Sequence, residues 1–186
     1  MTGPVEALLV VDVQRALVEG DTAVPDATDL LDRLRSLLER ARGSGVPVLH
    51  LQDNGVDDDL IRRGTEGWEL ALAPADGEPV IGKDADDGFE GTVLDQLLRA
   101  HGVETLAVVG IQSEMCVAAT VRGAIARGFA VVLPRDGHAT FDIPAAGPSA
   151  PGVAARLVSR VAEWSLGDGV DAPDSVEAVL FAERHA

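Results

Sequence analysis

The feature that most constrains the fold is an alternation between short apolar runs and longer segments with helical periodicity. The run Ala7-Leu8-Leu9-Val10-Val11 and the run from Glu104 to Ile111 are apolar over most of their length, which is typical of strands buried inside a parallel sheet. Between them, leucines recur at helical spacing from Asp26 to Arg42, with Pro25 before this segment and Gly43 after it. This alternation predicts an α/β fold whose parallel sheet is covered by helices on both faces.

The other expected elements continue the same pattern. Further strands are expected at residues 46–51, 79–82, 129–133 and 169–170, and further helices at residues 92–101, 114–127, 152–164 and 175–184. Residues 52–78 are mostly polar, and so long an irregular stretch in a compact domain is usually a functional loop. No repeat or long linker divides the 186 residues, so residues 1–186 are expected to form a single domain.

Three residues of different chemistry fall at or just beyond the ends of expected strands, where open parallel sheets carry their sites. They are Asp12, Lys83 and, in the turn that leads into the next helix, Cys116. Asp12 alone is more simply explained as a helix cap or a turn residue. A carboxylate at the end of a buried strand is costly unless it is paired or catalytic, however, and Lys83 supplies a partner. Together the three predict a site in which Asp12 accepts the thiol proton and an ammonium favours the thiolate.

Cys116 is the only cysteine of the chain and lies between a buried strand and the following helix. The N-terminal end of a helix lowers the pKa of a thiol, and its N–H groups stabilise an oxyanion in acyl transfer. A small buried core residue explains the position equally well. A redox-sensing thiol is a weaker explanation, because the chain has no second cysteine to resolve it.

The charge of the chain excludes some partners and suggests another. With 15 basic and 31 acidic residues the net charge is −16, which would repel a nucleic-acid backbone. A solubilising surface is the ordinary explanation, and a field that concentrates a cationic substrate is the sharper one. Lys83 is the only lysine, and unlike Arg it is suited to proton-transfer chemistry. The single cysteine, the lack of a signal-peptide pattern and the absence of a long apolar run predict a cytoplasmic protein without a membrane partner.

The histidines offer alternative chemistry that the sequence does not favour. His101 falls on the opposite side of the predicted sheet, and His50 lies within a strand. His138 follows a strand and is expected to contact substrate rather than to act in catalysis. His50 and Asp53 alone are too few to form a metal site, and the glycine spacings match neither a dinucleotide fingerprint nor a phosphate-binding loop. No metal or other cofactor is therefore expected.

The motifs around these residues resemble those of the isochorismatase-like cysteine hydrolases. The strongest match is Val109-Gly110-Ile111-Gln112-Ser113-Glu114-Met115-Cys116-Val117. Further matching motifs are Leu8-Leu9-Val10-Val11-Asp12-Val13-Gln14, Gly67-Trp68-Glu69-Leu70, Val80-Ile81-Gly82-Lys83 and Phe89-Glu90-Gly91-Thr92-Val93-Leu94. The matches extend over about three quarters of the chain. Within the family, Gln112-Ser113-Glu114 together with Asp136-Gly137-His138-Ala139-Thr140 most resembles the streptothricin-hydrolase-like branch.

This resemblance implies a fold, an oligomeric state and roles for particular residues. The implied fold is a three-layer αβα Rossmann-like arrangement around a mainly parallel six-stranded sheet, and the implied state is a homo-oligomer, either a dimer or a tetramer. Asp12, Lys83 and Cys116 would form a catalytic triad. A non-proline cis peptide at Ile111–Gln112 would aim the N–H groups of Gln112 and Cys116 at an oxyanion. Contacts with a small-molecule substrate are expected from Gln14, Leu17, Trp68, Met115 and His138.

Departures from the family pattern narrow the expected reaction. Nicotinamidases carry a metal-binding Asp/His set that is not found after His50, and members that cleave a vinyl ether lack the nucleophilic cysteine. We therefore expect hydrolysis of a non-peptide carbon–nitrogen bond in an amide, lactam or ureide, through a thioester on Cys116. The alternatives are a non-catalytic binding or assembly protein that retains the fold, and an isochorismatase-type ether hydrolase.

Overall fold

A seven-stranded sheet forms the centre of the computed structural model, which describes residues 3–56 and 58–183. Six strands follow the order β3-β2-β1-β4-β5-β7, and β6 pairs with β4 beside this path. Every pairing between these named strands is parallel. The strands are β1 (Ala7–Val11), β2 (Val48–Asp53), β3 (Val80–Lys83), β4 (Thr105–Ile111), β5 (Ala130–Val132), β6 (His138–Ala139) and β7 (Val170–Asp171).

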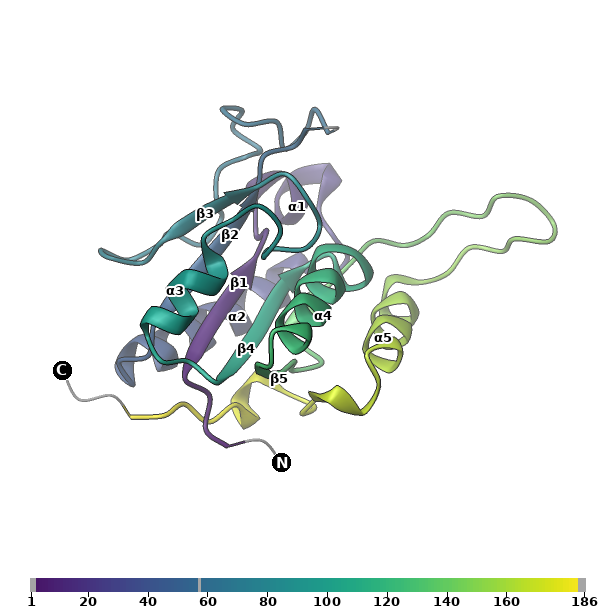
Figure 1. Ribbon diagram of the computed structural model, residues 1–186. Coiled ribbons are helices and arrows are strands. Elements are labelled where there is room, and N and C mark those ends of the chain that lie inside the picture. Colours follow the sequence, from purple (N-terminus) through teal and green to yellow (C-terminus); the bar gives the residue numbers. More distant parts are fainter. Residues whose placement is uncertain (1–2, 57, 184–186) are drawn as a thin grey trace.

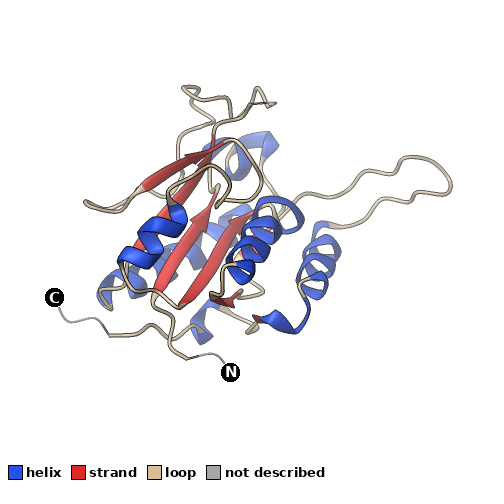
Figure 2. Cartoon of the chain, in the orientation of Figure 1, coloured by secondary structure: helices blue, strands red, loops and turns tan. Residues whose placement is uncertain are grey.

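Helices cover both faces of the sheet and give the three layers (Figures 1 and 2). On one face, Leu8 and Val10 of β1 pack in a common core with the leucines of α2. On the other face, Leu9 of β1 packs in a core that includes Leu94 of α3 and Val121 of α4. The helices are α1 (Arg15–Val18), α2 (Ala27–Gly43), α3 (Leu94–Ala100), α4 (Ala118–Ala126) and α5 (Ala155–Ser165), and the short helical turns are η1 (Gly20–Thr22), η2 (Ser113–Val117), η3 (Gly167–Gly169) and η4 (Val176–Ala178). The expected three-layer, mainly parallel α/β fold is confirmed.

The seventh strand arises because two short strands share one edge of β4. β5 pairs with the first residues of β4, from Thr105 to Ala107, and β6 pairs with the last two, Gly110 and Ile111. After β5 the chain leaves the sheet, and it returns as β6 alongside the last two residues of β4. The expected count of six strands describes the main path and omits β6, whose two residues are too short to give a periodic pattern.

Two expected helices differ in the structure. The helix expected at residues 114–127 is split into η2 and α4, because Met115 has non-helical dihedral angles (φ −105°, ψ −106°). The helix expected at residues 175–184, whose last residue lies outside the described part of the chain, is wrong: only η4 is helical there. Arg40 donates hydrogen bonds to the carbonyls of Val176 and Val179, and Val5 forms a bridge with Phe181. These contacts use backbone groups that a helix would need.

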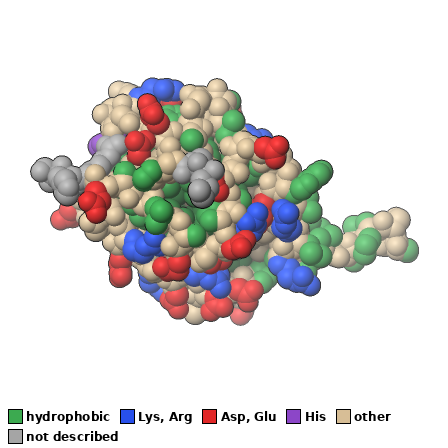
Figure 3. Space-filling model, turned by 90° about the horizontal axis from the view of Figure 1, so that it is seen from below, with side chains coloured by type: hydrophobic (Ala, Val, Ile, Leu, Met, Phe, Trp, Pro, Cys, Tyr) green, Lys and Arg blue, Asp and Glu red, His purple; other side chains and the backbone are tan. Residues whose placement is uncertain are grey.

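Residues 142–153 project from the body of the protein as a hairpin-like arm that leads into α5 (Figure 1). Ile143 and Val153 pair at its base, and Ala146 donates to the carbonyl of Ala150 near its tip. Figure 3 shows hydrophobic side chains along this arm, while charges of both signs are interspersed over the body. Among the described residues, no helix combines the length and the apolar character needed to cross a membrane.

Candidate active site

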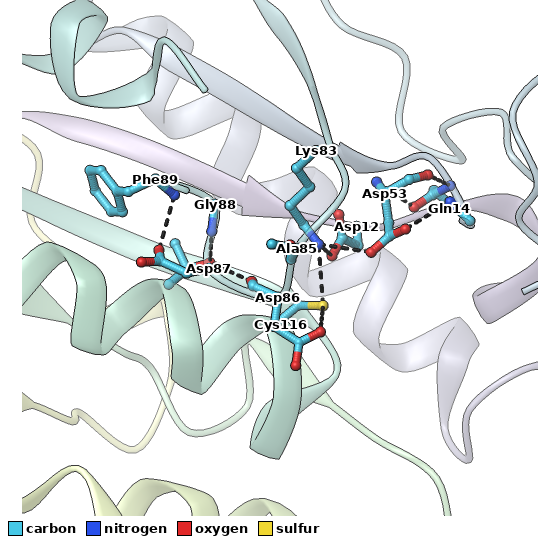
Figure 4. A network of polar contacts seen from close by, with 12 residues as sticks. Asp12, Gln14, Asp53, Lys83, Ala85, Asp86, Asp87, Gly88, Phe89 and Cys116 are labelled. Carbon is cyan, nitrogen blue, oxygen red and sulfur yellow. Dashed lines mark hydrogen bonds and ion pairs between the residues drawn. The ribbon is translucent and has the colours of Figure 1, made fainter. Parts of the chain in front are cut away.

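The carboxyl ends of β1, β3 and β4 bring Asp12, Lys83 and Cys116 together at one edge of the sheet (Figure 4). Asp12 directly follows β1 in a left-handed backbone conformation with φ 49°, and Lys83 is the last residue of β3. Cys116 lies in η2, which begins two residues after β4 ends. Parallel strands end at the same edge of a sheet, so three segments far apart in the sequence converge there.

The ammonium of Lys83 is the centre of this cluster. Its Nζ lies 2.9 Å from a carboxylate oxygen of Asp12 and 3.3 Å from Sγ of Cys116. It also donates to the carbonyl of Ala85 at 3.1 Å. Lys83 is 1% exposed and Asp12 is 2% exposed, so both charges are removed from water and depend on each other.

Asp53, the last residue of β2, is a member of the cluster that sequence reasoning did not assign to it. Its carboxylate lies 2.9 Å from Nζ of Lys83, beside that of Asp12 (Figure 4). The signal was present, because Asp53 ends a strand exactly as Lys83 does. It was considered only as a metal ligand beside His50, whereas His50 instead bonds to Glu78 at 3.0 Å.

Burial and neighbouring charges set the protonation states of the cluster. Burial raises the pKa of Asp12 to about 6, although the Lys83 ammonium opposes this shift. Lys83 is also desolvated, yet Asp12 and Cys116 hold its pKa above the usual lysine range, so it remains an ammonium. Burial and then the Asp12 carboxylate raise the pKa of Cys116, against the effect of Lys83. The expected lowering of the pKa of Cys116 is therefore wrong for the free protein, in which Cys116 is a thiol.

The thiol opens into a cavity of about 310 Å³. Its Sγ donates to a carboxylate oxygen of Asp86 at 3.6 Å, and Asp86 is exposed. Acidic side chains dominate the polar part of the described lining, where Asp12, Asp53, Asp58, Asp84 and Asp86 are found. The apolar part of the described lining is formed by Leu17, Val56, Ile61, Ala85, Ile111 and Met115.

Only some of the residues expected to bind substrate line this cavity. Leu17 and Met115 do so, and Met115 is 45% exposed. Gln14 is fully buried, and its amide bonds to the backbone of Asp53 and to the carbonyl of Trp68. Trp68 and His138 lie outside the lining, and His138 lines a second cavity.

The turn that carries Cys116 follows a non-proline cis peptide bond between Ile111 and Gln112, as expected. The carbonyl of Gln112 accepts from the backbone N–H groups of Met115 and Val117, which closes η2 over a single turn. Ile111, Gln112 and Cys116 all line the cavity. The backbone expected to hold an oxyanion is therefore present at the same cavity as the thiol.

The oxygen and sulfur atoms of Asp12, Asp53 and Cys116 lie within 4.8 Å of one another, as ligands of a metal ion would. The Lys83 ammonium already lies within 3.3 Å of one atom from each residue. A second cation in the same space would be repelled by this one. The arrangement therefore fits an acid–base cluster better than a metal centre.

Comparison with known proteins places this geometry in a family. Residues 6–146 match the model of the Isochorismatase domain. Two proteins named streptothricin hydrolase, both from Streptomyces noursei, are 52% and 53% identical to the chain over 96% and 95% of its length. The chain spans 72% of the length of the first protein and 65% of the second, so it is shorter than both.

More distant relatives share the fold and much of the sequence. An N-carbamoylsarcosine amidase from an Arthrobacter species is 36% identical over 85% of this chain and 64% of its own length. The crystal structure of a cysteine hydrolase from Pseudomonas syringae pv. phaseolicola 1448A superposes with a TM-score of 0.83 at 26% identity, covering 96% of this chain and 92% of that one.

Proposed function

The chain belongs to the isochorismatase family of hydrolases, and on this premise we propose that it cleaves amide-type carbon–nitrogen bonds of small molecules with Cys116 as the nucleophile. One observation carries the proposal: a thiol that opens into a cavity lies against a buried ammonium that is paired with a buried carboxylate. The similarity to an amidase supports the bond type. The cysteine itself favours acyl transfer over ether hydrolysis, because a thiolate attacks a carbonyl carbon readily.

The acylation step uses the carboxylate of Asp12 as the base. Asp12 takes the thiol proton as Sγ of Cys116 bonds to the substrate carbonyl carbon, and negative charge moves onto the carbonyl oxygen. Asp12 then returns the proton to the leaving nitrogen as the carbon–nitrogen bond breaks and leaves a thioester. An amide or ureide releases an amine or ammonia in this step, whereas a lactam opens and keeps its amine on the acyl group. Because Lys83 remains an ammonium, it stabilises the sulfur while it is negatively charged and does not itself transfer a proton.

Deacylation reverses the proton transfers with water in place of the thiol. Asp12 takes a proton from a water molecule as the water oxygen bonds to the thioester carbon. The carbon–sulfur bond then breaks to give a carboxylic acid. Cys116 leaves as a thiolate beside Lys83 and regains its proton from Asp12. In both steps the N–H groups of Gln112 and Cys116 are the proposed donors to the oxyanion.

The charge around the thiol supports a cationic substrate. Asp53, Asp58, Asp84 and Asp86 line the cavity, and no basic residue of the described chain is part of the lining. Asp12 and Asp53 are both committed to Lys83, whereas Asp58, Asp84 and Asp86 are exposed. These three carboxylates are available to an ammonium or guanidinium group on the substrate, which the net charge of −16 would also attract.

A panel of amides, lactams and ureides, each in a cationic and a neutral form, tests the proposal. Release of amine or ammonia, or ring opening in the case of the lactams, is measured with the wild-type protein and with Cys116→Ala. We expect turnover of at least one cationic member and a loss in Cys116→Ala on the order of 10⁴-fold or more, as for nucleophile removal in hydrolases that act by acyl transfer. Full turnover by Cys116→Ala would overturn the proposal.

A further inference from the structure

Ser113 and His138 form a buried polar pair outside the lining of the cavity that contains the thiol. Oγ of Ser113 lies 2.8 Å from Nδ1 of His138, and the two residues are 2% and 5% exposed. Oγ of Ser113 also lies 2.9 Å from Oγ of Ser159 on α5. Ser113 begins the turn that holds Cys116, so these bonds tie the nucleophile turn to β6 and to α5.

A second side-chain bond joins the same two segments. Thr140 donates to a carboxylate oxygen of Glu114 at 2.9 Å. Consecutive residues of the turn, Ser113 and Glu114, are thus each held by a residue in or just after β6. β6 is itself fixed to the last two residues of β4, immediately before the cis peptide bond. The attachment point of the turn and the residues that hold it therefore belong to one rigid part of the sheet.

The surroundings of His138 determine which ring nitrogen carries the proton. Burial lowers the pKa of His138 to about 4, so the ring is neutral at ordinary pH. Its Nε2 has no hydrogen-bond partner and lies 3.7 Å from a carboxylate oxygen of Glu163. A lone pair facing a carboxylate would be repelled, so the proton is assigned to Nε2. Nδ1 then accepts from the hydroxyl of Ser113, which in turn accepts from Ser159.

The polar pair is not explained by packing stability alone. A buried imidazole with an unpartnered nitrogen costs free energy, and an apolar side chain of similar volume would fill the space without that cost. The pair fixes the orientation of η2, which contains only one turn and is distorted at Met115. Such a turn has few backbone hydrogen bonds of its own, and an error of about 1 Å in the position of a reacting atom costs on the order of 100-fold in rate.

We propose that His138 is a positioning residue for the nucleophile, which it holds in place through Ser113. The inference rests on the proposed function in that Cys116 is the nucleophile. It replaces the expectation that His138 contacts substrate with a role at the back of the turn.

The test compares five variants by kcat, KM and the rate at which iodoacetamide alkylates Cys116: four single substitutions and the double variant that combines His138→Leu with Ser113→Ala. His138→Leu removes the acceptor, His138→Asn restores an acceptor at the place of Nδ1, and Ser113→Ala removes the donor. His50→Leu is the matched control, because His50 is equally buried (1% exposed) but belongs to β2 and bonds to Glu78.

For His138→Leu we expect kcat to fall by about 100-fold with KM changed by less than about threefold. Alkylation of Cys116 should change by about fivefold or more, since Sγ moves relative to Lys83, Asp12 and the surrounding protein, which together set its pKa. His138→Asn should recover most of both changes. Ser113→Ala should match His138→Leu, and the double variant should be no worse than either, because both changes break the same bond. His50→Leu should lower Tm without these changes.

An alkylation rate in His138→Leu that equals that of the wild type, together with a Tm loss like that of His50→Leu, would overturn the proposal. If His138→Leu does not fold, the alkylation rate of Cys116 in Ser113→Ala tests the proposal in the same way. Alkylation needs no substrate, so failure of the wild-type protein on every amide would count against the proposed function and leave the positioning test intact.

Discussion

At the scale of single residues, the proposed function depends on a cluster in which the buried ammonium of Lys83 and the carboxylates beside it stabilise one another. Lys83 lies within 2.9 Å of the carboxylates of Asp12 and Asp53 and 3.3 Å from the thiol of Cys116. The thiol is protonated in the free protein, because burial and Asp12 raise its pKa. In the proposed mechanism, nucleophilic attack is therefore coupled to proton transfer to Asp12. Slow alkylation of Cys116 at neutral pH would fit this site and would not indicate a non-catalytic protein.

The first prediction concerns the pH dependence of kcat/KM. Asp12 accepts a proton only when ionised, and its pKa is about 6, so kcat/KM should be level above that pH and fall about tenfold per pH unit below it. Asp12→Asn should lose about 10²- to 10⁴-fold in kcat/KM. Asp86→Asn is the control, since Asp86 contacts the same sulfur, and its kcat/KM should still fall at acidic pH. If this fall is lost in Asp86→Asn and retained in Asp12→Asn, Asp86 is the base.

The second prediction concerns the free energy of unfolding. Lys83→Met leaves the buried carboxylate of Asp12 without its cation, which should cost about 3–5 kcal/mol at pH 8. Lys83 lowers the pKa of Asp12, so this pKa rises further in the variant. The carboxyl group is then neutral at pH 5 and the penalty for its charge disappears. Urea unfolding at both pH values measures the difference, and a loss of equal size at pH 5 and pH 8 would contradict the assigned ion pair.

At the scale of elements, the site depends on how closely β1 and β4 approach each other at their carboxyl ends. Gly110 of β4 pairs with Val11 of β1 and has φ 129°, a conformation that other residues rarely adopt. A Cβ at this position would lie 2.0 Å from the carbonyl oxygen of Val11. Because backbone atoms cannot yield as a flexible side chain does, the two strands would have to separate beside Asp12.

The third prediction follows from this close approach. Gly110→Ala should lower the free energy of unfolding by about 4 kcal/mol or more, since it combines a steric clash with a strained φ. Gly102→Ala is the matched control, with φ 64° but nothing within 4 Å of the added Cβ, and should cost only about 1–2 kcal/mol. Urea unfolding of the two variants measures both. Equal losses would mean that strain alone, and not the contact with β1, restricts position 110.

The strand ends explain why much of the site could be predicted from the sequence. β1 was predicted at its exact bounds because an apolar run that stops at a charged residue marks both a strand and its end. The same pattern identified Asp12 and Lys83, whereas Asp53 lies two residues beyond the strand expected at residues 46–51. The position of His138 could not be predicted, because it depends on β6, whose two residues carry no periodic signal. The C-terminal segment could not be predicted either, because its backbone carbonyls are bonded by Arg40 from α2, a contact between residues distant in the sequence.

At the scale of the whole molecule, the net charge of −16 and the carboxylates of the cavity act in the same direction. A surface of this charge attracts cations over a distance set by the salt concentration, and a cleft lined by the same sign of charge strengthens the field locally. The solubilising and the functional explanations of the acidic composition are therefore compatible. The homo-oligomer implied by the resemblance stays a prediction.

The fourth prediction follows from this field. For a cationic amide substrate, kcat/KM should fall by about tenfold between 10 mM and 500 mM NaCl, because salt screens the attraction. A neutral amide of the same shape is the control and should change less than about twofold. Asp84→Asn should weaken the salt dependence for the cationic substrate only. Equal salt dependence for both substrates would contradict a role of the cavity charge in recognition.

The most direct test of the central claim is the mass of the protein during turnover. Wild-type protein is mixed with an amide that it hydrolyses, quenched in acid within milliseconds to seconds, and analysed intact and after digestion. We predict a transient mass increase equal to the acyl part of the substrate, located on the peptide that contains Cys116 and absent from Cys116→Ala. An acyl group on any other residue, or undiminished turnover by Cys116→Ala, would contradict the claim that Cys116 is the nucleophile.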